Sequence, residues 1–360
     1  MPATPEPRKP NRRPGALRRL ADALWGALRR QPIKATLCAV CFGAYMGVDI
    51  WDDVAPVGTH DWIADQLSGL RVADPGDFHF IVYGDNRGDN PPFASILDEA
   101  AADPDAAFVV GNGDMVKTPG KENYRQFLQQ VSTRLHVPFI PAPGNHDVDD
   151  GGLLWRRIMG PLNYTFRIGA NALIVFDDNT ADALAESRLQ WLEQALADAQ
   201  DCDTRIVVLH IPPFDRPNGI VEHCIPEAES RRLLEILHNG RATYVFASHA
   251  HGYYAGDYGG IPYTITGGGG ARLAGSTPEH HFFHYLRVHL HGGQVDVEVQ
   301  PVPSPLSQRW FGPYGYAAWI TIRDLATFQG LETSLLIATI VLGLLLIRPL
   351  PRQSKAEAGT

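Results

Sequence analysis

Five predicted strands of this chain each end at side chains that can bind a metal ion. Each of these side chains follows an apolar run, at the point where the run gives way to a turn or loop. Strands that run parallel in one sheet bring their carboxyl ends together, and open α/β sheets place their ligands in the crevice there. We therefore expect these side chains to lie close together in space. They are Asp85, Asp114, Asn145, His210 and the pair His249 and His251.

This set mixes carboxylate, amide and imidazole ligands, and such a mixture suits Zn, Mn or Fe better than Ca. It also holds more ligands than a single ion needs, which predicts two divalent metal ions as cofactors. Two ions a few ångströms apart can hold a bridging hydroxide and clamp a phosphate during in-line displacement. Because a bound metal lowers the pKa of water to about 7, hydroxide is available at neutral pH. Two such ions are therefore suited to chemistry at a phosphate group.

The segments that must position these residues alternate between strand and helix patterns. Strands are predicted at 78–83, 106–110, 137–140, 205–209 and 242–247, each shortly before one of the residues above. Helices are predicted at 93–102, 122–135, 185–199 and 227–238. Further strands are predicted at 164–168, 172–176, 262–266, 282–290 and 294–299. Alternating strands and helices with a β-rich end favour an α/β fold of two stacked sheets with helices outside.

The order of the motifs resembles that of the calcineurin-like metallophosphoesterases, a superfamily that includes purple acid phosphatases and cyclic-nucleotide phosphodiesterases. The resemblance covers about residues 77–302 and implies a two-sheet αββα sandwich that hydrolyses a phosphate monoester or diester. The motifs that carry it are Gly84-Asp85, Gly113-Asp114, Gly144-Asn145-His146-Asp147, His210 and His249-Ala250-His251.

The resemblance also implies a role for each motif residue. The implied ligands of the first ion are Asp85, Asp114 and His251. The implied ligands of the second ion are Asp114, Asn145, His210 and His249, with Asp114 bridging the two. His146 would lie beside the leaving oxygen as a proton donor or charge stabiliser, and Asp147 would orient it.

The first motif departs from the family pattern. The usual Asp-x-His is here Asp85-Asn86-Arg87, so an always-charged guanidinium replaces an imidazole. Three interpretations stay open: the first ion binds weakly, Arg87 with Asn86 binds a phosphate of the substrate, or Arg87 is a surface residue. In the second motif Lys117 stands where the family usually has Asp or Asn, which removes an expected support of the ligands.

These departures leave two alternatives to a two-ion hydrolase. One is an enzyme with a single ion, held by Asp114, Asn145, His210 and His249. The other is an inactive relative that acts as a binding or scaffold protein. Metal content and turnover distinguish the three.

Two apolar runs flank the predicted domain, and both lie next to basic tails. Residues 1–34 carry nine Lys or Arg against two acidic residues, and residues 348–360 carry three against one. The sequence predicts a basic tail (1–34), a transmembrane anchor (35–50), a linker (51–76), the metallophosphoesterase domain (77–303), a second linker (304–330), a transmembrane helix (331–347) and a second tail (348–360). A signal-peptide core or a buried helix is the alternative for the first apolar run.

Basic residues stay on the cytoplasmic side of a membrane. Both termini are therefore expected in the cytoplasm, with the domain between them on the periplasmic or extracellular side and the lipid bilayer as a partner. The protein as a whole has a net charge of -9, and its acidic body argues against nucleic-acid binding. The expected substrate is a phosphate ester, lipid-linked or a nucleotide. Cys202 and Cys224 form either a disulfide or two thiols, and the sequence indicates no oligomeric state.

Overall fold

The computed structural model describes residues 29, 31–54, 61–148, 150–179, 184–213, 225, 227–324 and 328–347. The chain divides into two compact units, one formed by residues 1–55 and 323–360 and the other by residues 56–322. The larger unit contains every strand of the described residues. It is therefore the unit that carries the predicted site.

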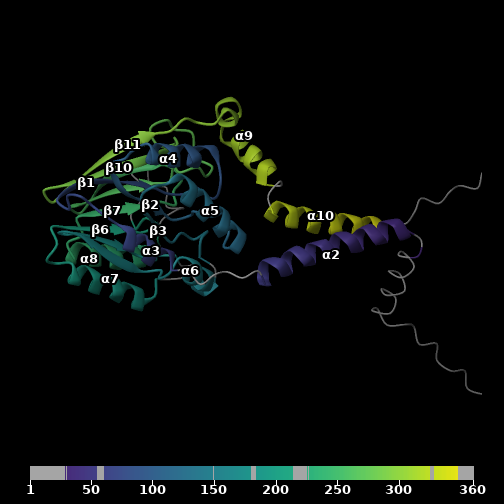
Figure 1. The fold of residues 1–360 in the computed structure, drawn as a ribbon, viewed down its shortest axis with the longest axis horizontal. Coiled ribbons are helices and arrows are strands. Elements are labelled where there is room, and N and C mark those ends of the chain that lie inside the picture. The colour runs from purple at the N-terminus through teal and green to yellow at the C-terminus, as the bar shows by residue number, and fades with distance from the viewer. Residues whose placement is uncertain are drawn as a thin grey trace, which may run out of the picture. The chain divides into compact units, whose positions relative to one another are not determined.

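Two sheets form the larger unit, and both mix parallel and antiparallel strands (Figure 1). The first sheet has the order β11-β10-β1-β2-β3, and β1, β2 and β3 run parallel. Its strands are β1 (Asp77–Tyr83), β2 (Ala106–Asn112), β3 (Phe139–Ala142), β10 (His284–His291) and β11 (Gln294–Pro301).

The second sheet has the order β4-β5-β6-β7-β9-β8, with β5, β6, β7 and β9 parallel. Its strands are β4 (Tyr164–Ile168), β5 (Asn171–Val175), β6 (Thr204–Val208), β7 (Tyr244–Ala247), β8 (Tyr253–Tyr258) and β9 (Ile261–Thr266). In both sheets the parallel strands are buried along most of their length. Parallel strands read as continuous apolar runs because both faces of such a sheet are covered.

Aromatic side chains join the two sheets. Phe80 of β1 stacks on Phe108 of β2 at 4.6 Å between ring centroids and meets Phe246 of β7 edge-on at 6.5 Å. On the outer side of the first sheet, Phe93 stacks on Phe127 at 5.8 Å. Apolar residues of α7 and α8 form a separate core against the second sheet, and Figure 1 shows both helices below β6. The predicted two-sheet sandwich with outer helices is thus confirmed.

Helices and one short 3-10 turn connect the strands. Asn90 begins α4 by accepting a hydrogen bond from the Phe93 N–H, followed by prolines in the first turn, which is a favoured start for a helix. These elements are α3 (Trp62–Gly69), α4 (Pro91–Ala101), α5 (Lys121–Arg134), η1 (Asp150–Gly152), α6 (Leu153–Ile158), α7 (Glu186–Asp198), α8 (Glu227–Asn239) and α9 (Leu306–Asp324).

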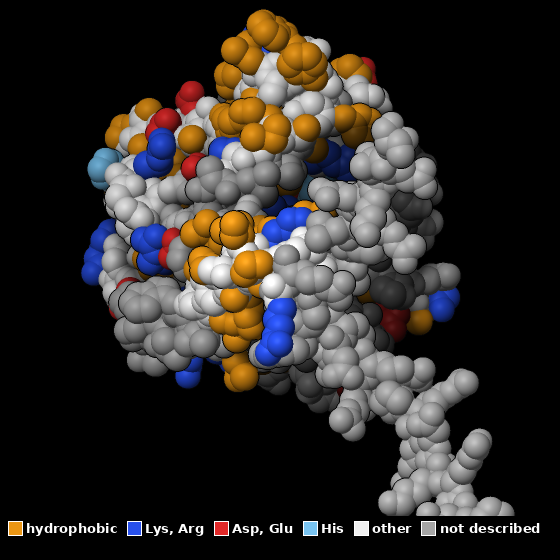
Figure 2. All heavy atoms as spheres, turned by 90° about the vertical axis from the view of Figure 1, so that its right-hand side faces the viewer, with side chains coloured by type: hydrophobic (Ala, Val, Ile, Leu, Met, Phe, Trp, Pro, Cys, Tyr) orange, Lys and Arg blue, Asp and Glu red, His pale blue; other side chains and the backbone are white. Residues whose placement is uncertain are grey.

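Both segments predicted as linkers contain a helix. Residues 62–69 form α3, and residues 306–324 form α9, which changes direction at Gly312. Figure 2 shows hydrophobic side chains gathered at the top of the view, where α9 lies in Figure 1. The large side chains that α9 exposes are Leu306, Trp310, Phe311, Tyr314, Trp319 and Ile322.

The smaller unit contains α2 (Pro32–Val54) and α10 (Phe328–Ile347), which pack along each other. The Gln31 side chain lies 3.5 Å from the Leu346 carbonyl, and Cys38 lies 3.5 Å from the Thr339 carbonyl. Because Gln31 precedes Cys38 while Leu346 follows Thr339, the two helices run antiparallel. Of the described residues, no helical stretch combines the length and the apolar character that crossing a membrane requires. Most of the predicted basic tails, and Cys224, lie outside the described residues.

Candidate metal centre

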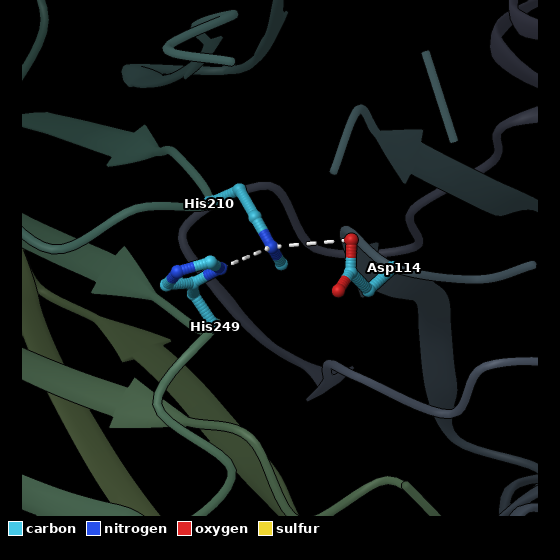
Figure 3. Close-up of side chains that lie close together, drawn as sticks. All are labelled: Asp114, His210 and His249. Carbon is cyan, nitrogen blue, oxygen red and sulfur yellow. Dashed lines mark hydrogen bonds and ion pairs between the residues drawn. The ribbon is translucent and has the colours of Figure 1, made fainter. Parts of the chain in front are cut away.

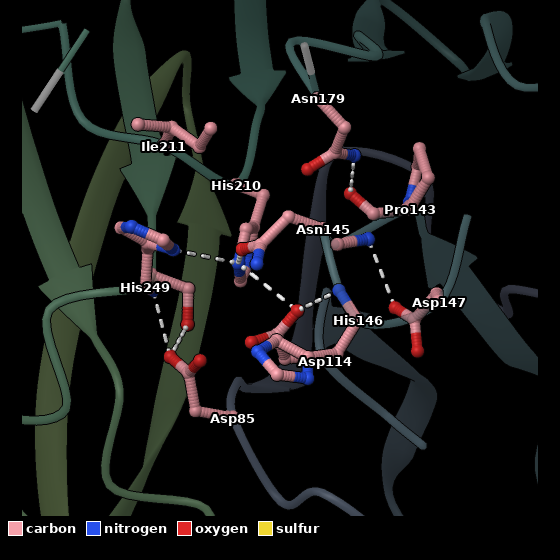
Figure 4. Close-up of polar contacts among 12 residues, drawn as sticks. Asp85, Asp114, Pro143, Asn145, His146, Asp147, Asn179, His210, Ile211 and His249 are labelled. Atoms are coloured by element: carbon pink, nitrogen blue, oxygen red, sulfur yellow. Dashed lines mark hydrogen bonds and ion pairs between the residues drawn. The ribbon is translucent and has the colours of Figure 1, made fainter. Parts of the chain in front are cut away.

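The loops after β1, β2, β3, β6 and β7 meet at one edge of the sandwich. Figure 4 shows side chains from these loops pointing toward one another, as the strand-end pattern predicts. The described residues contain two groups whose ligand atoms all lie within 4.8 Å of one another. Both groups include Asp114. One is Asp114, His210 and His249, and the other is Asp85, Asp114 and His251.

The first group is centred on His210, which is fully buried. Its Nε2 atom lies 3.3 Å from both Asp114 Oδ1 and His249 Nδ1 (Figure 3). The same atom lies 3.1 Å from Asn145 Oδ1. The other ring nitrogen lies 3.1 Å from the carbonyl of Asn112 at the end of β2. A hydrogen bond from that nitrogen to a carbonyl leaves Nε2 as a lone-pair donor, which is how proteins orient metal-binding imidazoles.

The second group contains two buried atoms without a hydrogen-bond partner, Asp85 Oδ1 and His251 Nε2. They lie 3.4 Å apart. The other oxygen of Asp85 accepts hydrogen bonds from the Ser248 hydroxyl and the His249 N–H, and His251 Nδ1 lies 2.7 Å from the Arg272 carbonyl. Buried polar atoms without partners are costly, and an ion held between these two atoms would satisfy both. The donor set therefore fits a divalent metal.

Backbone strain is concentrated in the same loops. Six described residues other than glycine have positive φ angles, and only Arg241 lies outside the candidate site. Such residues are rare and cluster at functional sites, where the surrounding structure enforces the strain. The five in the site are Asp85 (60°), Arg87 (48°), Asp114 (55°), His249 (65°) and His251 (42°).

Two glycines allow the loops to approach each other closely. A Cβ atom on Gly144 would lie 2.0 Å from the backbone nitrogen of Asp114, and one on Gly113 would lie 2.2 Å from His210 Nδ1. Neither position has space for a side chain. The glycines before Asp114 and Asn145 are thus required by packing.

The charges of the site favour a cation. Burial opposes ionisation of Asp114, but His210, Arg87 and His146 outweigh it and hold its pKa well below the usual value. Burial likewise opposes the charged form of His210, but Asp114 and Asp85 raise its pKa to about 10. Surroundings that retain a proton so strongly on a buried imidazole are acidic enough to attract a divalent cation in its place.

Arg87 binds the carboxylate that the two groups share. Its Nε and Nη2 atoms donate to Asp114 Oδ2 at 3.1 and 2.8 Å, and 27% of its side chain is exposed. The prediction for Asn86 needs correction, because this residue is fully buried and its amide donates to the carbonyls of Met115 and Gly88. Asn86 joins two loops and has no surface with which to contact a substrate.

The predicted pairing of Asp147 with His146 is also wrong. Asp147 is buried, and its carboxylate accepts hydrogen bonds from the N–H groups of Met115, Val116 and Gly144 at 2.8–2.9 Å. The His146 ring instead lies 2.7 Å from the Lys117 carbonyl, and the backbone N–H of His146 donates to Asp114 Oδ1. Asp147 therefore fixes the loops after β2 and β3, and its carboxylate does not orient the His146 imidazole.

Three residues outside the predicted set support the site. Asp178 accepts hydrogen bonds from the N–H groups of His210 and Ile211 at 3.1 and 2.8 Å. Asn179 donates to the Pro143 carbonyl at 2.8 Å (Figure 4), and Ser248 donates to Asp85 at 2.6 Å. The one feature of the sequence that could have indicated Asp178 and Asn179 is that they follow β5, just as the proposed ligands follow their own strands.

The strand order, the carboxylate shared by the two ligand groups and the position of the loops can be compared with those of known protein families. Residues 76–253 match the family described as calcineurin-like phosphoesterase. This part of the chain is therefore a calcineurin-like phosphoesterase domain, as the motifs predict.

Two curated relatives and one solved structure give the comparison more detail. A probable cyclic nucleotide phosphodiesterase of Rhodopseudomonas palustris is 31% identical over 179 residues, which cover 46% of this chain and 64% of that protein. A glycerophosphodiester phosphodiesterase of Enterobacter lignolyticus is 29% identical over 201 residues, covering 51% and 71%. A purple acid phosphatase from yellow lupin (Lupinus luteus) seeds has a TM-score of 0.54 at 16% identity, covering 64% of this chain and 52% of that one. At this identity the last match supports the fold alone.

Proposed function

We propose that this protein is a metal-dependent phosphoester hydrolase. The observation that carries the proposal is the pair of ligand groups that share Asp114, each with its ligand atoms within 4.8 Å. When bound, two divalent ions (Mn, Zn or Fe) would lower the pKa of a bound water molecule, and their positive charge would lie beside the phosphate. The names of the two curated relatives are those of phosphodiesterases, which favours a diester as the substrate.

The protein's own residues position and neutralise the phosphate. The groups of Asp114, Asn145, His210 and His249 and of Asp85, Asp114 and His251 are the proposed ligands. His146 is half-buried beside Asp114, where its imidazole can give a proton to the leaving oxygen. Arg87 is partly exposed at the same edge, where its planar fork can bind phosphate oxygens.

A direct test measures hydrolysis of a chromogenic phosphodiester and monoester by the full chain after metal removal and addition of Mn. We expect diester turnover that depends on metal and is lost in Asn145→Ala and His249→Ala. The matched control is His289→Ala, because His289 lies near the start of β1, at the end opposite Asp85. Folded protein that binds no metal and hydrolyses neither ester would instead support the scaffold alternative.

We also propose that α2 and α10 attach the protein to a lipid bilayer, with the catalytic domain on the non-cytoplasmic side and both termini in the cytoplasm. Support comes from the large apolar side chains that this helix pair exposes, since exposed patches of this kind mark interaction sites. They include Ile33, Leu37, Val40, Phe42, Leu336, Ile337, Ile340, Val341 and Leu344.

Cell fractionation and protease protection test this second proposal. We expect the full chain in the membrane fraction, released by detergent and not by alkaline carbonate, with the domain digested only from the outer side. Recovery in the soluble fraction would contradict membrane attachment. Digestion of the domain only from the cytoplasmic side would contradict the proposed topology.

A further inference from the structure

We propose that the Arg87 guanidinium neutralises the Asp114 carboxylate in place of a metal ion. The protein would then bind one metal ion readily and the second only when Arg87 leaves Asp114. This inference rests on the proposed function and concerns the order in which the site fills. Numbered here by the order of binding, the first ion would occupy the site of Asp114, Asn145, His210 and His249, which the family resemblance numbers second. The second would bind at Asp85, Asp114 and His251.

The contacts of Asp114 divide between its two oxygens. Oδ1 faces His210 Nε2 at 3.3 Å and accepts the His146 N–H at 2.8 Å. Oδ2 accepts two hydrogen bonds from Arg87, the shorter at 2.8 Å. A guanidinium remains charged at every pH of interest, so its charge opposes a second cation on the same carboxylate. The described contacts of Oδ1 include no guanidinium or ammonium group.

The backbone holds Arg87 beside Asp114. The Arg87 N–H donates to the Asp114 carbonyl at 2.8 Å, and the neighbouring Gly88 N–H donates to the Met115 carbonyl at 2.8 Å. Arg87 also has a φ of 48°, a conformation that costs energy in a residue with a side chain. The loop is thus fixed while the end of the side chain, 27% exposed, can turn toward solvent.

The site that Arg87 opposes is otherwise prepared for an ion. Asp85 Oδ1 and His251 Nε2 are buried without hydrogen-bond partners, and both of their residues are held by other contacts at the opposite atom. Three protein ligands and no further imidazole make this the weaker of the two sites. Its occupancy therefore depends on whether Arg87 or an ion neutralises Asp114.

A phosphate group offers Arg87 another partner. Guanidinium forms bidentate hydrogen bonds with phosphate as well as with carboxylate. A phosphate at the site would draw Arg87 from Asp114 and free that carboxylate for the second ion. By linkage, phosphate must then raise the affinity for the second ion, and the second ion must raise the affinity for phosphate by the same factor.

Equilibrium dialysis of the metal-free full chain against Mn, with elemental analysis of bound metal, tests this scheme without relying on activity. We expect the wild type to bind one ion tightly and a second at least about tenfold more weakly. Inorganic phosphate should reduce this difference in affinity between the two ions. Arg87→Gln should tighten the second ion by about tenfold or more, because it removes a full charge beside the ligand. Arg87→His, which adds an imidazole, should tighten it further.

Two controls keep the result specific. Arg87→Lys retains the charge and should behave like the wild type. Arg134→Gln removes a charge from an exposed pair with Asp98 and should change nothing. Equal binding of two ions by the wild type, or one ion in every variant including Arg87→His, would overturn the inference while leaving hydrolysis possible. Absence of bound metal in all variants would overturn the proposed function itself.

Discussion

Replacing Gly144 with alanine should push apart the two loops that meet at Asp114. The new Cβ would lie 2.0 Å from the Asp114 backbone nitrogen and 2.5 Å from its Oδ1 atom. Non-bonded carbon contacts are favourable at about 3.5–4.0 Å, so the loops must separate by more than about 1 Å. Neither contact is with the end of a flexible side chain, because the backbone is fixed and the Asp114 carboxylate is held by Arg87 and His146.

The expected loss follows from this displacement. Misplacing a reacting group by about 1 Å can cost on the order of 100-fold in rate, and overpacking of this kind costs about 1–3 kcal/mol of stability. We therefore expect Gly144→Ala to lower kcat/KM for a phosphodiester by about 100-fold and to weaken Mn binding.

Steady-state kinetics and urea denaturation, run in parallel, measure both effects. Gly69→Ala is the matched control, since nothing lies within 4 Å of a Cβ at that position. If Gly144→Ala bound Mn and hydrolysed the diester as well as Gly69→Ala does, the close approach of the two loops would not be needed for function, and this reasoning would fail.

Four further predictions concern stability, turnover and metal binding. Asp147→Asn should lower the free energy of unfolding by about 2–4 kcal/mol, because the side chain at this position would keep only one oxygen to accept the three backbone N–H groups. His146→Ala, in contrast, should lower turnover with little effect on urea denaturation. Burial lowers the pKa of His284 to about 4. The neutral, buried His284 side chain therefore contributes its full stabilisation of the folded protein above the unfolded-state pKa of about 6.5, and this stabilisation is lost as the pH falls through 4. In acid titrations between these values, the wild type should lose up to about 3 kcal/mol that His284→Gln does not lose. Mn at 100 times its dissociation constant should stabilise chelator-treated protein by about 2.7 kcal/mol; no change in thermal midpoint would argue against binding to the folded state.

The sequence predicted that these side chains would lie close together, because each follows an apolar strand and the carboxyl ends of parallel strands share one edge of their sheet. Asp85, Asp114, His210, His249 and His251 each follow a buried strand, and the structure brings them to one edge. The pattern of alternating strands and helices was sufficient to predict both sheets. The edge strand β8, in contrast, was not predicted: it contains Gly256 and Asp257, which are typical of turns, and most of its residues are exposed.

The supporting contacts could not be read in the same way. In a turn such as Gly144-Asn145-His146-Asp147, side chains of similar type stand side by side, and only the backbone angles decide which points inward. Asp147 points to three N–H groups, while Asn145 points to His210. Asn86 and Ser248 likewise depend on loops far apart in the sequence. Contacts of this kind are tertiary and leave no local pattern.

A crystal structure of the full chain with Mn, located by anomalous scattering, would test the central claim most directly. We predict Mn within about 2.0–2.2 Å of Asp114 and His210 ligand atoms, at the distances usual for such ligands, with a second peak beside Asp85 and His251 when phosphate is present. Anomalous density at neither position, with Arg87 still bound to Asp114 at saturating Mn, would contradict the account of this site as a metal centre.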